Sequence, residues 1–167
     1  MKVFNRYTVG YLLLIVSAII VGLFYLMVSP VTTSQETSGS HTFLILSQGN
    51  QSDIDRRVNF LIESNDQFVY VWEQAFGKGS VPPLVDFERD VVVASFYGKT
   101  TTGGHSVSVL DVRDVIATER RISFVYEKPA QQCFATQALE APYQIIAVKK
   151  SELPVVKESI ERETECR

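Results

Sequence analysis

The chain has 167 residues, of which 46% are hydrophobic and 21% are charged, and its formal net charge is −3. No extreme of composition is reached, which excludes a disordered tail protein, a coiled-coil rod, a disulfide-dense miniprotein and a multi-pass membrane protein. The 16 basic residues are outnumbered by 19 acidic ones, so the clustered positive charge of a nucleic-acid-binding protein is missing. The length fits one domain with a short appendage.

The appendage lies at the N-terminus. No formal charge occurs between Arg6 and Glu36, and the apolar residues 9–28 have about the length that a helix needs to cross a bilayer. Because Lys2 and Arg6 precede this stretch, the positive-inside rule places residues 1–8 in the cytoplasm. We therefore predict a single-pass protein of the cytoplasmic membrane, anchored by residues 9–28, with a periplasmic or extracellular C-terminal domain.

A cleaved signal peptide is the alternative interpretation of this segment. Its apolar run is usually only about 7–15 residues long and ends in a small-residue cleavage site. Here the run is longer, and Pro30 follows Ser29, where cleavage would be most natural. Without Lys2 and Arg6, the rest of the chain has 14 basic and 19 acidic residues, a balance of −5.

The outer part begins with a stalk and continues as a folded domain. Residues 29–40 are rich in Ser and Thr, which predicts a flexible stalk. A domain is expected over residues 41–156, followed by a charged tail over 157–167 that the four-residue spacing of Glu161 and Glu165 would allow to be helical. Short apolar or alternating runs predict strands at 41–47, 56–62, 91–97, 106–116, 120–128 and 143–149. The run 91–97 is apolar on both faces, which predicts a central place in its sheet.

One helix is predicted over residues 65–76. Ser64 and Gln67 fit a capping box at its start, and Gly77 ends it. An apolar stripe at helical spacing follows the cap and consists of Phe68, Val71, Trp72, Ala75 and Phe76. We expect Trp72 to anchor this helix to a sheet. The chain is therefore predicted to be α+β, with a mostly antiparallel sheet of about six strands and one helix packed on a face.

The catalytic inventory is thin. Neither His41 nor His105 has a second ligand at zinc-like spacing, and no phosphate-binding or nucleophile-elbow motif is present. No metal, no cofactor and no enzymatic activity are therefore expected. The remaining hydrolase hypothesis joins His105 and Ser106 in space with Asp86 or Asp111.

The most unusual segment is a loop expected between two strong strands, residues 99–105. It contains Lys99, Thr100, Thr101, Thr102, Gly103, Gly104 and His105. Its glycines permit a close approach of another backbone, while its polar side chains offer donors on a loop. A partner-binding loop and a turn that needs glycine only for its own geometry are both compatible with this pattern.

Two cysteines remain, Cys133 and Cys166. In an extracytoplasmic compartment they could form a disulfide bond, and two free thiols are the alternative. Sequence alone leaves both open.

A series of short motifs, taken in order, resembles the C-terminal domain family of PrcB, a subunit of a bacterial cell-surface protease complex. These are Pro83, 85–87 (VDF), 91–93 (VVV), 98–99 (GK), 102–104 (TGG), Pro129, 137–139 (QAL) and 142–143 (PY). The resemblance covers roughly residues 56–153. The chain departs from the family at His105, where a tyrosine is usual, and in its helix anchor, where a lipoprotein-type start is common.

The resemblance implies a non-enzymatic accessory protein that binds and stabilises or modulates a secreted or surface protease. Loop 99–105 and a second segment with Gln137, Pro142 and Tyr143 would make the contacts. The alternative is a small-ligand or glycan-binding envelope domain, with a pocket between the helix and the sheet beneath Trp72.

Overall fold

The computed structural model describes residues 39–133 and 136–165. The predicted anchor over residues 9–28 lies outside the described residues, as do Cys166 and almost all of the predicted stalk. Among the described helices, none has the length and apolarity to cross a bilayer.

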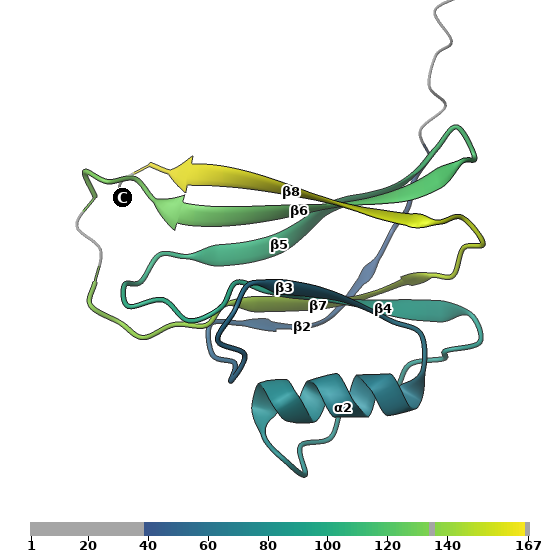
Figure 1. Ribbon diagram of the computed structural model, residues 1–167, viewed down its shortest axis with the longest axis horizontal. Helices are drawn as coiled ribbons and strands as arrows, with labels where there is room; N and C mark the ends of the chain where they lie inside the picture. The colour runs from purple at the N-terminus through teal and green to yellow at the C-terminus, as the bar shows by residue number, and fades with distance from the viewer. Residues whose placement is uncertain (1–38, 134–135, 166–167) are drawn as a thin grey trace, which may run out of the picture. The chain divides into compact units, whose positions relative to one another are not determined.

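The described residues form eight strands and one helix, and the strands make two four-stranded sheets that pack face to face (Figure 1). Sheet A has the order β1-β5-β6-β8, and sheet B has the order β2-β7-β4-β3. The elements are β1 (Gly39–Ser40), β2 (Leu44–Gly49), β3 (Val58–Ile62), α2 (Asn65–Phe76), β4 (Asp90–Phe96), β5 (Ser106–Val115), β6 (Glu119–Pro129), β7 (Tyr143–Lys149) and β8 (Val155–Thr164).

The α+β class is confirmed, but the prediction of one sheet with about six strands is wrong. Alternation along a strand shows which residues share a face, and it carries no information on which strands pair. All pairings are antiparallel except that of β6 with β8, which is parallel.

Helix α2 begins and ends where the sequence predicts. The Ser64 side chain accepts a hydrogen bond from the Gln67 amide, and the Gln67 side chain accepts one from the Glu63 amide. At the other end, Gly77 has a φ of 91° and its N–H bonds the Glu73 carbonyl. Local capping therefore sets where this helix begins and ends, while its apolar stripe packs on sheet B.

Strand β4 lies in the middle of sheet B and is buried on both faces. Val91 and Val93 face the core between the two sheets. Val92, Ala94 and Phe96 face the other core, which helix α2 covers. Two apolar surroundings explain why this strand is an uninterrupted apolar run in the sequence, and they confirm its predicted central place.

The C-terminal segment was predicted as a charged tail that could be helical, and this is wrong. It forms β8, which lies parallel to β6 from Arg120↔Val155 to Pro129↔Thr164. Its charged side chains bond residues of the other sheet and the residue before it: Lys157 donates to the Asn59 carbonyl in β3, and Arg57, which precedes β3, donates to Glu161 at 2.6 Å. The domain therefore extends to residue 164, because long-range pairing outweighs a composition that suits a helix.

Sheet A has two distinct ends. Strand β5 runs from Ser106 at one end to Val115 at the other, about 30 Å away at the usual rise of a strand. We call the first the groove end, because the open groove described in the next subsection adjoins it. We call the second the hairpin end, because β5 turns there into β6. Strand β1 pairs with Arg113 and Asp114, so the described chain enters at the hairpin end.

A buried arginine holds the hairpin end together. Arg120 is 4% exposed, and it donates to both carboxylate oxygens of Asp114, at 2.7 and 3.0 Å, and to the Lys149 carbonyl. His41, the first residue after β1, lies 2.8 Å from Asp114 and 3.2 Å from Arg120 through its Nε2. Hydrogen bonding from Arg120, with His41 adding to it, lowers the pKa of Asp114 despite partial desolvation.

Candidate functional site

The two segments predicted to contact a partner lie side by side at the groove end. Thr100 and Glu140 exchange backbone hydrogen bonds in both directions, at 2.7 and 3.2 Å. The Gly103 amide donates to the Thr136 carbonyl at 2.9 Å. Loop 99–105 is therefore attached by its backbone to the segment that precedes β7.

The glycine pair of the loop is needed by the fold itself. A Cβ atom on Gly103 would lie 2.5 Å from Thr136 Oγ1 and 3.3 Å from Glu140 Oε1, so the Thr136 side chain would have to move to make room for it. Gly104 has space around it, but its φ of +89° is strained for residues with a side chain. The interpretation that the loop needs glycine for its own geometry is thus supported, and any contact role falls to its other residues.

Aromatic rings pack against the last residue of the loop, His105. His105 Nδ1 donates to the Thr102 carbonyl at 2.9 Å, and its ring lies edge-on to Tyr97, with 5.1 Å between centroids. Tyr97 contacts Tyr126 in turn, and the Arg57 guanidinium lies 4.2 Å from the Tyr126 ring centroid. These contacts fix His105 as part of the loop's support.

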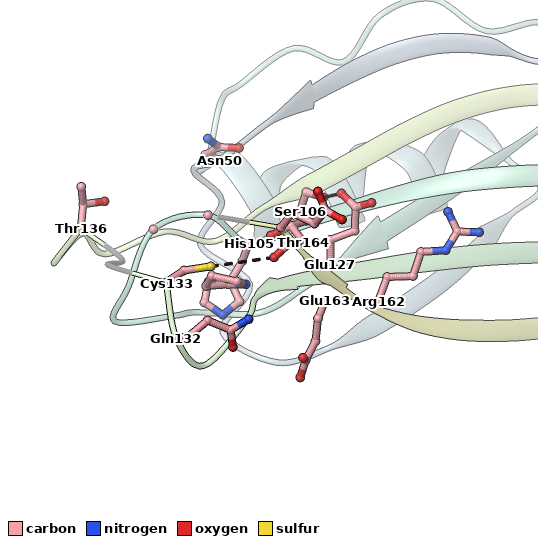
Figure 2. Close-up of a pocket in the computed structure, with 14 residues that line it drawn as sticks. Asn50, His105, Ser106, Glu127, Gln132, Cys133, Thr136, Arg162, Glu163 and Thr164 are labelled. Atoms are coloured by element: carbon pink, nitrogen blue, oxygen red, sulfur yellow. Dashed lines mark hydrogen bonds between the residues drawn. The ribbon is translucent and has the colours of Figure 1, made fainter. Parts of the chain in front are cut away.

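An open groove of about 960 Å³ adjoins the loop (Figure 2). Its walls come from the loop, the chain after β6, the last residues of β8 and Asn50. Ser106 donates to Glu127 at 2.8 Å across one wall. Glu127, Arg162, Glu163 and Glu165 are among the lining residues, so the lining carries more acidic than basic groups.

Cys133 lies on the groove wall and is disulfide-bonded. Its sulfur is 4.0 Å from the carbonyl oxygen of Thr164, two residues before Cys166 in the chain (Figure 2). A disulfide sulfur has no hydrogen to donate, so this distance records proximity only. Pairing with Cys166 remains a prediction, because Cys166 lies outside the described residues.

The predicted contact residues differ in accessibility. Lys99, Thr101 and Gln137 are exposed. Pro142 is buried, and the Tyr143 ring packs on Phe76 with 4.9 Å between centroids. These last two therefore support the fold, and the exposed three remain as candidate contacts.

Two residues of this site were missed by the sequence analysis. Leu139 is 82% exposed and immediately precedes Glu140, which is bonded to the loop through Thr100. Glu140 has a buried Oε2 with no hydrogen-bond partner among the described residues. Leu139 belongs to the 137–139 motif of the resemblance and is an apolar residue in a polar segment, whereas nothing in the sequence distinguished Glu140.

The hydrolase arrangement is not assembled. Ser106 bonds Glu127, and His105 bonds a backbone carbonyl. Asp86 bonds Arg89 at 2.6 Å, and Asp111 accepts from Ser40 at 3.0 Å. Within residues 39–133 and 136–165, no three His, Cys, Asp or Glu side chains are grouped as a metal site would require.

The place suggested for a small-ligand pocket is filled by side chains. Trp72 packs against Phe68 and Phe76, with ring centroids 5.7 and 4.6 Å away. These rings join the core between helix α2 and sheet B. Trp72 therefore anchors the helix as predicted, and the space beneath it is packed core.

Comparison with protein families places the site within a known one. Residues 91–149 match the family described as PrcB C-terminal, which confirms the resemblance over a shorter range than 56–153. Comparisons with curated proteins and with solved structures found no match. The matched segment runs from β4 to β7 and includes loop 99–105 together with the segment bonded to it. Residues 91–149, about a third of the chain, are therefore similar to the PrcB C-terminal family.

Proposed function

We propose that this chain is a membrane-anchored, extracytoplasmic accessory module without catalytic activity, which binds a secreted or surface protease at its groove end and stabilises or modulates it. The family match suggests association with a protease complex. The observation that carries the proposed site is the pairing of loop 99–105 with the segment before β7, beside an open groove.

The exposed side chains at the groove end suit recognition of another protein. Thr100 and Glu140 form an antiparallel bridge between the loop and the segment before β7. Thr101 comes directly after Thr100 and Leu139 directly before Glu140, so these two residues lie close together on the two segments. Lys99 adds a positive charge, and Leu139 offers an apolar side chain that the domain leaves in solvent. A rigid backbone that displays a few exposed side chains loses little entropy on binding.

The place where the described chain begins leaves the groove open. Strand β1 lies at the hairpin end, about 30 Å from the groove end along β5. The first described residues therefore do not line the groove.

The test is co-purification of the tagged full chain from native membranes, read by proteolytic activity and by mass spectrometry of the bound protein. Leu139→Asp should abolish capture of the protease, while Leu84→Asp is the matched control. Leu84 is also fully exposed, and it lies in the connector between α2 and β4. Equal capture by both variants would reject the groove-end site, and failure of the wild-type chain to retain any protease would reject the function.

A further inference from the structure

Strand β8 forms one outer edge of sheet A, and no strand within the described residues pairs with its outer side (Figure 1). Because β8 runs parallel to β6, alternate residues turn their backbone N–H and C=O groups toward β6. The Arg120 amide donates to the Pro154 carbonyl at 2.9 Å. Ten residues further along both strands, the Ala130 amide donates to the Thr164 carbonyl at 3.3 Å. The even-numbered residues therefore bond β6, and the odd-numbered residues of β8 present their backbone groups to the outer edge.

The charges along β8 form a self-complementary pattern. A long free edge is a template for another strand, and the side chains that it carries indicate which strand fits. Lys157 lies three residues before Ile160, and Glu163 lies three residues after it. Glu158 and Arg162 lie two residues before and after the same isoleucine. If β8 of a second copy pairs antiparallel about Ile160, Lys157 and Arg162 each face a glutamate of the other copy, and such cross-strand pairs are stabilising.

The backbone groups permit this register. It sets Ser159 opposite Glu161 of the second copy, and both belong to the odd-numbered set whose backbone groups point outward. Pairing about a point between two residues would set odd-numbered against even-numbered residues, so the ladder could not bond. A centre at Glu161 would place that carboxylate opposite its own copy, and a centre at Ser159 would leave Arg162 opposite Val156. Charge therefore selects Ile160 among the centres that the backbone permits.

The side chains involved lack an opposite charge within one copy. Among the ion pairs of the part of the chain that the structure describes, none includes Lys157, Glu158 or Arg162. Lys157 donates to the backbone carbonyl of Asn59 at 2.9 Å. Glu158 accepts a hydrogen bond from the Ser123 hydroxyl at 3.3 Å. A second copy in this register supplies each of the three with a counter-charge.

Ile160 lies at the centre of the pattern and is only half-buried. It is opposite Val125 of β6, which is 2% exposed. Because the backbone groups of Ile160 face β6, its two copies form a non-hydrogen-bonded pair, in which Cα atoms lie about 4.5 Å apart and side chains touch. This contact removes from water apolar surface that one copy leaves exposed.

We propose that two copies of this chain associate through β8, antiparallel about Ile160, so that their sheets A become one continuous sheet with twofold symmetry. The pairing also reaches the groove, because Glu163 and Thr164 line it. Lys157 and Val156 of the second copy lie opposite these two residues and extend the groove wall with a cation and an apolar side chain. The dimer does not depend on the proposed binding of a protease, whose failure would leave it standing.

Charge reversal in the full chain tests the register, with association measured by sedimentation in detergent over a series of protein concentrations. Glu158→Arg and Arg162→Glu each set like charges against each other in both symmetry-related pairs, so each should weaken dimerisation about tenfold. The double variant restores opposite charges and should dimerise as the wild type does. Glu88→Arg is the matched control and should change nothing, because Glu88 is exposed and lies in the connector between α2 and β4.

A cysteine on the symmetry axis tests the centre of the pairing. Under mild oxidation, Ile160→Cys should give a covalent dimer on a non-reducing gel, since facing Cα atoms about 4.5 Å apart suit a disulfide. Copies of position 158 are offset by four residues, about 13 Å, so Glu158→Cys should give none. The wild type, run in parallel, shows any dimer that forms through the native cysteines.

Each measurement can overturn the proposal. A wild-type chain that sediments as a monomer at every concentration would reject the dimer. A dimer that charge reversal leaves unchanged, or that crosslinks equally from positions 158 and 160, would reject the pairing through β8.

Discussion

The groove end and the hairpin end of sheet A keep their shapes by different means. At the groove end, backbone hydrogen bonds and glycine geometry hold loop 99–105, so exposed side chains such as Thr101 and Leu139 take no part in the fold. At the hairpin end, side chains do the holding, through the buried Arg120 and its partners. Exposed residues such as Thr101 and Leu139 can therefore change at the first end without unfolding it, whereas changes to the Arg120 cluster at the second end affect stability.

The largest expected effect comes from removing the arginine of the hairpin end. Arg120→Met should lower the free energy of unfolding by about 3–5 kcal/mol, because it leaves the Lys149 carbonyl without its side-chain donor and Asp114 with His41 alone. Urea unfolding at pH 7 measures this. Arg89→Met is the control, since Arg89 is exposed and its removal should change little. Equal losses in both variants would contradict the assigned role of Arg120.

At the groove end, the disulfide bond of Cys133 is expected to stabilise the fold as Arg120 does at the hairpin end. If Cys133 pairs with Cys166, replacing both by alanine should lower the free energy of unfolding by about 3–4 kcal/mol, as expected for closure of a loop of this length. Peptide mapping without reduction identifies the bonded pair directly. A free thiol at Cys166 in the mature protein would rule the pairing out.

The two glycines test how the backbone of loop 99–105 is held in place. Gly103→Ala should cost about 1–3 kcal/mol, because its Cβ would overlap Thr136. Gly104→Ala should cost about 1 kcal/mol through its positive φ alone. Thermal unfolding checks both. A Gly103→Ala variant as stable as the wild type would mean that the loop is not held against Thr136.

A gain of stability is expected at the turn of the hairpin end. Ile116→Gly should raise the free energy of unfolding by about 1 kcal/mol, since Ile116 has a φ of 47° and glycine tolerates positive φ. Denaturant unfolding of the chain in detergent measures this effect. A loss of stability would show that Ile116 packs within the domain.

The smallest effect is a pH dependence at the hairpin end. Because the pKa of Asp114 is lowered in the folded protein, its contribution is complete above the ordinary aspartate pKa of about 4. It is lost as the pH falls through that value toward the folded pKa. The stability difference between the wild type and Asp114→Asn should therefore shrink in urea titrations between pH 5 and pH 3. A difference that grows on acidification would contradict this sign.

The sequence was most informative where the signal was local. Helix α2 was predicted exactly, because its cap and stripe lie within a few residues of each other. Strand β7 was predicted exactly as well, and β4 was placed centrally from its unbroken apolar run. The two sheets and β8 could not be predicted in the same way, since they depend on pairings between distant residues such as Phe124 and Ser159.

The site shows the same division. The unusual loop 99–105 was visible, but its bonds to Thr136 and Glu140 and the groove beside it arise only in the folded chain. Arg120 and Arg121 look alike in sequence, although only the first is buried. Arg120, Ile122 and Phe124 are alternate residues of β6 and therefore point to the same face. This alternation could have indicated from the sequence that Arg120 is buried.

The central claim is that a protease binds at the groove end. Site-specific photo-crosslinking in native membranes tests it most directly, with a benzophenone amino acid placed at Thr101 or at Leu84 of the full chain. We predict a crosslinked protease, identified by mass spectrometry, from position 101 and none from position 84. Crosslinking of the protease from position 84 but not from position 101 would contradict the claim.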